Sequence, residues 1–256
     1  MNDAMKLERR SALVGLVALT ACRRTSPEKP LPALRHRPLA SLPTTTLPWL
    51  ALRDHFVATV GPSAGTGSPR GPLLVLADAT FAPRSRFPLH PHRDMEILSV
   101  VLTGTLSHHG DQAHGAVMPA RTAQLISSRD GIVHAEGNDT DTPTRMLQIW
   151  FQPTSHGGAP AYFQRDLSKK APRQPIAGDA EFPLRCDARV WWLDLEPGRE
   201  AQLEVAENRL GYLLALDGAV NAGVALAAGD GLDVGPGQLT VTVTAPCAAL
   251  WIDAAG

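Results

Sequence analysis

The stretch HPHRDMEILSVVLTG, residues 90–104, decides the fold of this chain. It places His90 and His92 two residues apart, ahead of an apolar run that ends at Gly104, a pattern typical of a β-strand followed by a turn. Successive side chains of a strand point to opposite faces, so both imidazoles point the same way. Pro91 removes one donor from the ladder, which favours a strand end. The stretch therefore predicts β structure with a pair of histidines at its entrance.

A second pair, His134 and Glu136, closes another apolar stretch and again shares one face of a strand. Three imidazoles and one carboxylate suit a first-row transition metal such as iron, manganese, nickel, copper or zinc. Four protein ligands leave positions open on an octahedral ion, where chemistry can occur. A lone His-x-His is common in loops, but two pairs at strand ends favour one metal site.

Glu96 offers an alternative carboxylate. It lies four residues after His92 and has the same parity on a regular strand. Either Glu96 or Glu136 could bind the metal, and the other could orient an imidazole or act as a general base. Asp94 shares this parity, but its place beside Arg93 indicates a solvated ion pair.

Three segments carry a resemblance to a known family: HPHRDMEIL at 90–98, GIVHAE at 131–136 and LQIW at 147–150. Together they resemble the pirin family, bicupin proteins that include bacterial quercetin 2,3-dioxygenases. The resemblance implies an all-β bicupin of two tandem β-barrels (double-stranded β-helices), with a metal site in the N-terminal barrel only. It implies one mononuclear ion, iron before manganese, nickel, copper, cobalt or zinc, with the ligands His90, His92, His134 and Glu136. Arg121-Thr122 departs from the family, which usually has a Gly-Asp turn there.

The activity that this resemblance implies is that of a metal-dependent dioxygenase. Its partners would be O₂ and a small aromatic, flavonol-like substrate, with Glu136 or Glu96 as the catalytic proton acceptor. Because one fold hosts many reactions, two alternatives stay open. One is a non-enzymatic metal- or redox-responsive binding protein, as eukaryotic pirins suggest, and the other is an isomerase or hydrolase that uses the metal as a Lewis acid.

Composition agrees with a β-rich protein of two domains. The chain has 256 residues, 44% of them hydrophobic, with 22 Gly and 22 Pro, which suits turn-rich β structure. A formal net charge of −1, with no basic stretch outside the N-terminus, argues against nucleic acid as a partner. Nucleophile-elbow, Walker and dinucleotide motifs are absent from the sequence. We expect a monomer.

The N-terminus reads as an export signal. Basic residues precede an apolar run that ends in Leu19-Thr20-Ala21-Cys22, which resembles a bacterial lipobox. We therefore expect an exported protein on the periplasmic side, anchored to the membrane only through a lipidated Cys22, with a cytoplasmic protein as the alternative. The expected segments are a signal peptide (1–21), a Pro-rich tether (22–48), the metal-binding cupin domain (49–153), a connection (154–183) and a degenerate cupin domain (184–256).

Other side chains receive simpler interpretations. No histidine follows His156, which excludes a second centre of the same kind in the C-terminal half. The cluster His108, His109 and His114 indicates a solvated hairpin. Cys186 and Cys247 could form a disulfide, but two unpaired buried thiols are favoured. Apolar residues that could line a pocket beside the metal, or pack in the core, are Phe81, Phe87, Met118 and Ile126.

Overall fold

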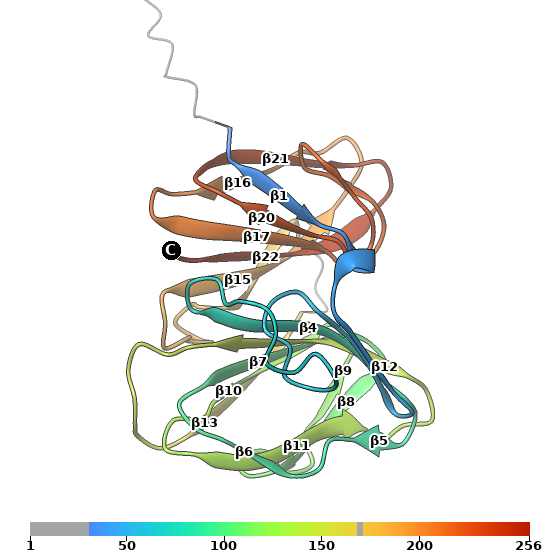
Figure 1. The fold of residues 1–256 in the computed structure, drawn as a ribbon, viewed down its shortest axis with the longest axis vertical. Helices are drawn as coiled ribbons and strands as arrows, with labels where there is room; N and C mark the ends of the chain where they lie inside the picture. The colour runs from blue at the N-terminus through green and yellow to red at the C-terminus, as the bar shows by residue number, and fades with distance from the viewer. Residues whose placement is uncertain (1–30, 168–170) are drawn as a thin grey trace, which may run out of the picture.

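The computed structural model describes residues 31–167 and 171–256, which form two β-barrels stacked along the long axis of the molecule (Figure 1). Apart from one 3-10 turn, η1 (Leu39–Ser41), the regular structure in these ranges is all strand. The prediction of an all-β bicupin is confirmed. The described part of the chain contains no helix long and apolar enough to cross a membrane.

The first barrel is built from two antiparallel sheets. Its seven-stranded sheet runs, in spatial order, β13 (Ala161–Asp166), β10 (Thr122–Ser127), β7 (Glu96–Thr103), β12 (Thr144–Phe151), β4 (Leu73–Phe81), β3 (Leu50–Asp54) and β2 (Thr44–Leu47). Its five-stranded sheet runs β5 (Ser85–Arg86), β11 (Ile132–Asn138), β8 (Thr105–Gly110) and β9 (Val117–Pro119), with β6 (His90–His92) also paired to β11.

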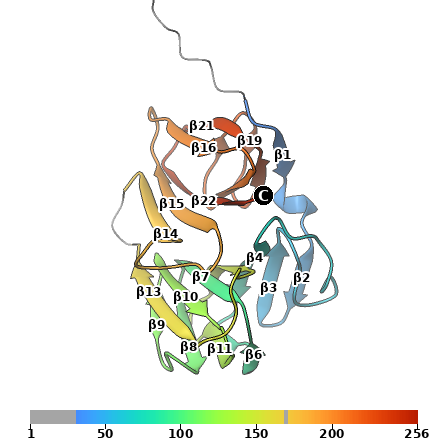
Figure 2. The same cartoon turned by 90° about the vertical axis from the view of Figure 1, so that its left-hand side faces the viewer.

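The second barrel has the same layout. Its six-stranded sheet runs β1 (Leu34–Arg37), β20 (Gly231–Val234), β17 (Arg209–Ala215), β22 (Cys247–Ala255), β15 (Ala188–Leu195) and β14 (Arg173–Ala177). Its four-stranded sheet runs β16 (Ala201–Val205), β21 (Gly237–Val243), β18 (Val220–Asn221) and β19 (Ala225–Leu226). Figure 2 shows this barrel above the first, with β15 and β14 on the side that faces it.

Strand β7 shows why the two barrels stay together. Ile97 and Val101 point into the first barrel, whereas Leu98 and Val100 point to the opposite face and pack in a core shared with the second barrel. Both faces of the sheet are therefore buried at its central strands, so β7 reads as a nearly continuous apolar run and not as an alternating one. The interdomain core fixes one barrel on the other.

The expectation of a tether over 22–48 is wrong for its described part. Residues 34–37 form β1, which pairs with β20 of the second barrel, and residues 44–47 form β2 on the edge of the first. Pro38 precedes η1 and Pro43 precedes β2. These prolines lie outside the short strands and therefore do not prevent strand pairing. The segment joins the two barrels along one side.

The expected connection, 154–183, also contains structure. Residues 161–166 form β13, an edge strand of the larger sheet of the first barrel. Residues 173–177 form β14, an edge strand of the second barrel. Edge strands carry fewer apolar residues because one of their edges faces solvent, which explains the polar sequence. The expected signal peptide and Cys22 lie outside the described residues.

Two smaller expectations concern the cysteines and Arg121. Cys186 and Cys247 are unpaired, and they pack against different cores, the interdomain one and that of the second barrel. Arg121 occupies a left-handed turn position, with φ 62°, where a glycine would be free of strain. Its guanidinium reaches across to the second barrel, donating to Asp194 Oδ1 and Oδ2 over 2.9 and 3.0 Å.

Candidate metal centre

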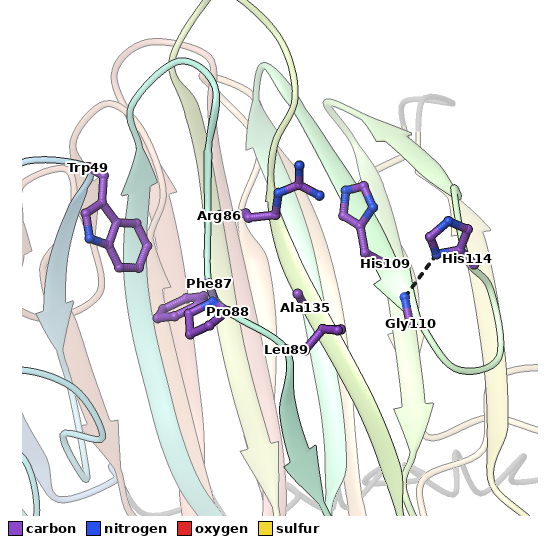
Figure 3. A pocket seen from close by; sticks show the side chains of 9 residues that line it. All are labelled: Trp49, Arg86, Phe87, Pro88, Leu89, His109, Gly110, His114 and Ala135. Atoms are coloured by element: carbon purple, nitrogen blue, oxygen red, sulfur yellow. Dashed lines mark hydrogen bonds between the residues drawn. The ribbon is translucent and has the colours of Figure 1, made fainter.

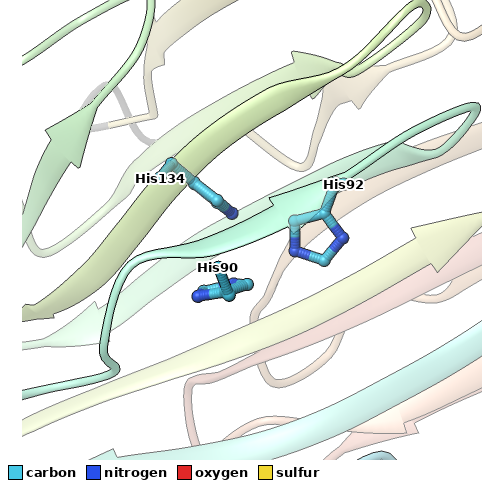
Figure 4. Close-up of side chains that lie close together, drawn as sticks. All are labelled: His90, His92 and His134. Carbon is cyan, nitrogen blue, oxygen red and sulfur yellow. The ribbon is translucent and has the colours of Figure 1, made fainter.

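Strand pairing brings three histidines together on the inner face of the smaller sheet of the first barrel. In the β6–β11 ladder His90 lies directly opposite His134, and His92 lies opposite Ile132. One ring nitrogen from each of His90, His92 and His134 lies within 4.8 Å of the other two (Figure 4). The ring centroids are 4.7 to 5.1 Å apart. The structure therefore brings together the three histidines that the sequence predicts as metal ligands.

The ring nitrogens of His90 and His134 are available to bind a metal. His90 Nδ1 donates to the Pro88 carbonyl over 2.8 Å, so Nε2 keeps its lone pair for a ligand. His134 is fully buried, and neither of its ring nitrogens has a hydrogen-bond partner among the described residues. A buried imidazole left in that state costs free energy that ligation of an ion would offset. Three neutral nitrogen donors suit a first-row transition metal.

Burial also sets the charge state of the rings. Desolvation, with a smaller contribution from His90, lowers the pKa of His92 to about 4. The pKa of His134 falls to about 2 because it is buried and its neighbours His90, His92 and His108 add positive charge when protonated. Both imidazoles are therefore neutral at pH 7, the form that binds metal.

Glu136 lies on the same face of β11 as His134 and lines a cavity together with His90 and His92. Its Oε1 accepts hydrogen bonds from Ser99 Oγ, over 2.6 Å, and from Gln124 Nε2. With its amide oriented to satisfy both ends, Gln148 donates to Oε2 over 3.0 Å and accepts from Trp150 Nε1 over 3.1 Å. Burial raises the pKa of Glu136 to about 7 against these hydrogen bonds. Donors on three strands hold the carboxylate at the polar end of the cavity, and it is not part of the group of ligand atoms within 4.8 Å of one another that the three histidines form.

Glu96 lies elsewhere, which corrects the expectation that it shares a face with His92. Asp94 adopts a left-handed φ of 50° between β6 and β7, so the parity counted along the sequence is reset at this bend. Glu96 accepts from Ser127 Oγ over 2.6 Å and points with Leu98 toward the second barrel. Asp94 itself contacts His156, over 3.3 Å, and not the three histidines.

A cavity of about 250 Å³ opens beside the three histidines. Its polar end is formed by His90, His92, Glu136 and Gln148, and Trp150 packs edge-on against His92 with centroids 5.0 Å apart. Of the residues expected to line a pocket, Phe81 and Phe87 do so, whereas Met118 and Ile126 are buried in the core. The remaining walls are mostly apolar: Leu52, Val60, Val75, Ala77, Ala79, Pro88 and Met146, with Thr59.

The three histidines of the cluster at 108–114 divide between the two faces of this barrel. His109 and His114 lie on the outer face beside a second, open hollow of about 670 Å³ (Figure 3), and His109 Nε2 pairs with Asp139 over 2.7 Å. These two agree with the solvated hairpin that the sequence predicts. His108 does not, because it is fully buried with its ring 5.3 Å from that of His134. Its parity with Leu106 on β8 was the sequence signal for this inward position.

Sequence comparisons agree with this architecture. The profile of the family described as Pirin matches residues 41–151, and that described as Quercetinase C-terminal cupin domain matches residues 175–254. A pirin-like protein of Caulobacter vibrioides is 35% identical over 184 residues, which cover 68% of this chain and 79% of the relative. Quercetin 2,3-dioxygenase of Escherichia coli is 30% identical over 168 residues, covering 63% of this chain and 73% of the relative.

Among solved structures, the bacterial pirin YhhW of Escherichia coli in complex with nickel(II) matches with a TM-score of 0.80. The match covers 87% of this chain and 99% of that protein at 23% identity, and it shows a common fold. A double-barrel cupin with a histidine cluster in its first barrel is the class that the fold and the site define. The chain belongs to the pirin family.

Proposed function

We propose that this chain is a metal-dependent dioxygenase that acts on flavonols or related aromatic compounds. The observation that carries the proposal is the placement of three histidine nitrogens within 4.8 Å of one another at the polar end of an apolar cavity. His90, His92 and His134 would hold one transition-metal ion, which we propose to be iron. The ion would supply coordination of substrate oxygens and redox chemistry with O₂.

The cavity suits a compact aromatic substrate. Its volume of about 250 Å³ is just below the range of roughly 300–1,000 Å³ usual for drug-sized ligands. Phe81, Phe87 and Trp150 offer flat apolar walls, while the polar groups gather at one end. A molecule with an aromatic body and adjacent hydroxyl or carbonyl oxygens at one edge fits this division.

Glu136 supplies the carboxylate of the centre. It faces the cavity with His90 and His92, and Ser99, Gln124 and Gln148 hold it in place. In this position it can accept the proton of a substrate hydroxyl, and it is the carboxylate available as a fourth ligand. Glu96 is separated from the cavity by the strand that carries it, and we assign it neither role.

The proposal is tested by elemental analysis of protein purified without added metal, followed by oxygen uptake with a panel of flavonols and smaller catechols. We expect close to one transition-metal ion per chain and consumption of substrate and O₂ in equal amounts by the loaded protein only. Turnover that continues under strict anaerobiosis would favour an isomerase or hydrolase. A loaded protein that turns over no member of the panel would favour a metal-dependent binding protein.

We also propose export and lipidation at Cys22, which rest on the Leu19-Thr20-Ala21-Cys22 motif. In such a location the protein would act on compounds outside the cytoplasm. The regulatory alternative, binding to transcription factors, would require the opposite location.

A further inference from the structure

His108 lies against the proposed metal site but is not one of its ligands. It is fully buried on β8, and its Nε2 lies 2.9 Å from the Asp111 carbonyl oxygen. A carbonyl can only accept, so Nε2 carries the proton and Nδ1 carries the lone pair. Nδ1 is buried without a hydrogen-bond partner among the described residues. Nδ1 of His108 is therefore a buried acceptor without a donor.

His134 lacks the opposite kind of partner, an acceptor for a ring N–H. When one nitrogen of a neutral imidazole binds a metal, the other carries a proton, and in metal sites that proton is normally donated to an acceptor. Both nitrogens of His134 are buried and lack a protein acceptor. The ring of His108 is 5.3 Å away between centroids, tilted by 42°. That separation leaves room for one hydrogen bond between facing nitrogens after a small ring rotation.

The backbone around His108 is built to hold this ring in place. In the β8–β11 ladder Gly110 lies opposite His134, so no side chain stands between His134 and its diagonal neighbour His108. Asp111 is itself tied to β11, because its carboxylate accepts from the amide of Val133 over 2.8 Å and its amide donates to the Val133 carbonyl over 2.9 Å. The anchor of His108 is therefore fixed to the strand that carries His134.

A competing donor is already engaged. Tyr162 lies near His108, with ring centroids 5.5 Å apart, but its hydroxyl donates to Gln164 Oε1 over 3.2 Å. His134 is then the neighbouring ring whose free nitrogen has no other acceptor.

We propose that His108 is a positioning residue of the metal centre, whose Nδ1 accepts the hydrogen bond from the nitrogen of His134 that does not bind the metal. The chain of contacts runs from the Asp111 carbonyl through both rings to the ion. It fixes the orientation of His134 and strengthens it as a ligand. The inference rests on the metal site of the proposed function and does not depend on which substrate is used.

Two amide substitutions separate the acceptor of His108 from its donor. His108→Asn places an amide oxygen near the position of Nδ1, and His108→Gln places an amide nitrogen near that of Nε2. His109→Gln is the matched control, because His109 lies on the same strand and faces outward. Affinity for Co²⁺ is measured for each variant by competition with a chelator, and the thermal stability of the metal-free proteins is recorded alongside.

We expect His108→Gln to weaken Co²⁺ binding by about 10–100-fold, the usual effect of losing such a partner, while His108→Asn and the control bind like the parent. In the cobalt-loaded protein, an exchange-protected imidazole N–H proton of His134 should persist in His108→Asn and exchange freely in His108→Gln. Equal affinity in all three variants, or equal loss in His108→Asn and His108→Gln, would overturn the inference. Unchanged binding by His134→Ala would instead overturn the proposed metal site itself.

Discussion

Ser99 Oγ donates a hydrogen bond to Glu136 Oε1 over 2.6 Å, and this contact spans the interior of the first barrel from β7 to β11. The two residues lie on different sheets, so the bond exists only when the barrel is closed. It holds the carboxylate at the polar end of the cavity that His90 and His92 also line, and for this reason we propose Glu136, and not Glu96, as the carboxylate of the centre.

The two glutamates should respond differently to the same substitution. Glu136→Gln keeps the side-chain shape but removes the charge that faces the cavity, so we expect weaker metal binding and turnover lower by at least about 100-fold. Glu96→Gln changes a carboxylate on the other face of its sheet and should keep both properties. Metal content by elemental analysis and oxygen uptake check the pair. Loss of metal from Glu96→Gln alone would contradict the assignment.

Removing a histidine of the cluster should remove the ion. In His92→Ala or His134→Ala two of the three imidazoles remain, and we expect metal content to fall from about one ion per chain to nearly none after dialysis. His114→Ala, on the exposed turn after β8, is the control and should retain full occupancy. Full occupancy in both cluster variants would contradict the ligand assignment.

The buried carboxyl group of Asp54 should make the stability of the protein depend on pH, even when no metal is bound. Neither of its carboxylate oxygens has a partner among the described residues, and burial raises its pKa from 3.8 to about 6. The folded state therefore favours the protonated form, so stability is lost as the pH rises from about 4 through 6 and the full cost remains above that range.

Asp54→Asn removes the charge and so removes this cost. We expect the variant to be more stable than the parent at pH 7.5, by up to about 3 kcal/mol for a shift of this size, and nearly equal at pH 4. Chemical denaturation of the metal-free proteins at both pH values measures the difference. A variant that is less stable at pH 7.5 would show that the carboxylate has a stabilising partner.

Substitutions of Arg121 should separate two opposing contributions to stability, the strain of its left-handed backbone and its ion pair with Asp194. Arg121→Ala loses two hydrogen bonds to Asp194 and one to the Leu167 carbonyl but keeps the left-handed backbone, so we expect a loss of about 1–3 kcal/mol. Arg121→Gly loses the same bonds and relieves the strain, and it should be about 1 kcal/mol more stable than the alanine variant. Urea denaturation ranks the three proteins. The reverse order of Ala and Gly would refute the balance.

The export proposal has a direct test at Cys22. We expect the full chain to label with palmitate in a Gram-negative host and to sediment with membranes, and Cys22→Ala to lose both properties because the lipid attaches to that thiol. Metal binding should be unchanged in the variant, since the barrels are intact. A parent protein found unlabelled in the cytosolic fraction would contradict the proposal.

Much of the centre could be predicted because it depends on alternation within single strands. His90 with His92, and His134 with Glu136, each share one face of an uninterrupted strand, and that relationship is local. The same logic failed for Glu96, because the left-handed backbone at Asp94 resets the alternation between β6 and β7. A single dihedral angle of this kind is set by the surrounding structure, and the sequence offered no glycine or Asn-Gly pair to reveal it.

The sequence by itself determined the β-rich class of the protein, its resemblance to pirins and the identity of three histidines, because strand periodicity and motif spacing are properties of neighbouring residues. Only the tertiary structure decided that His108 is buried against His134, that Ser99 and Gln124 hold Glu136, and that residues 34–37 complete the second barrel. These contacts join residues 12 to about 200 positions apart. They arise from the closure and stacking of two barrels, which buries polar groups together and requires them to find partners across sheets.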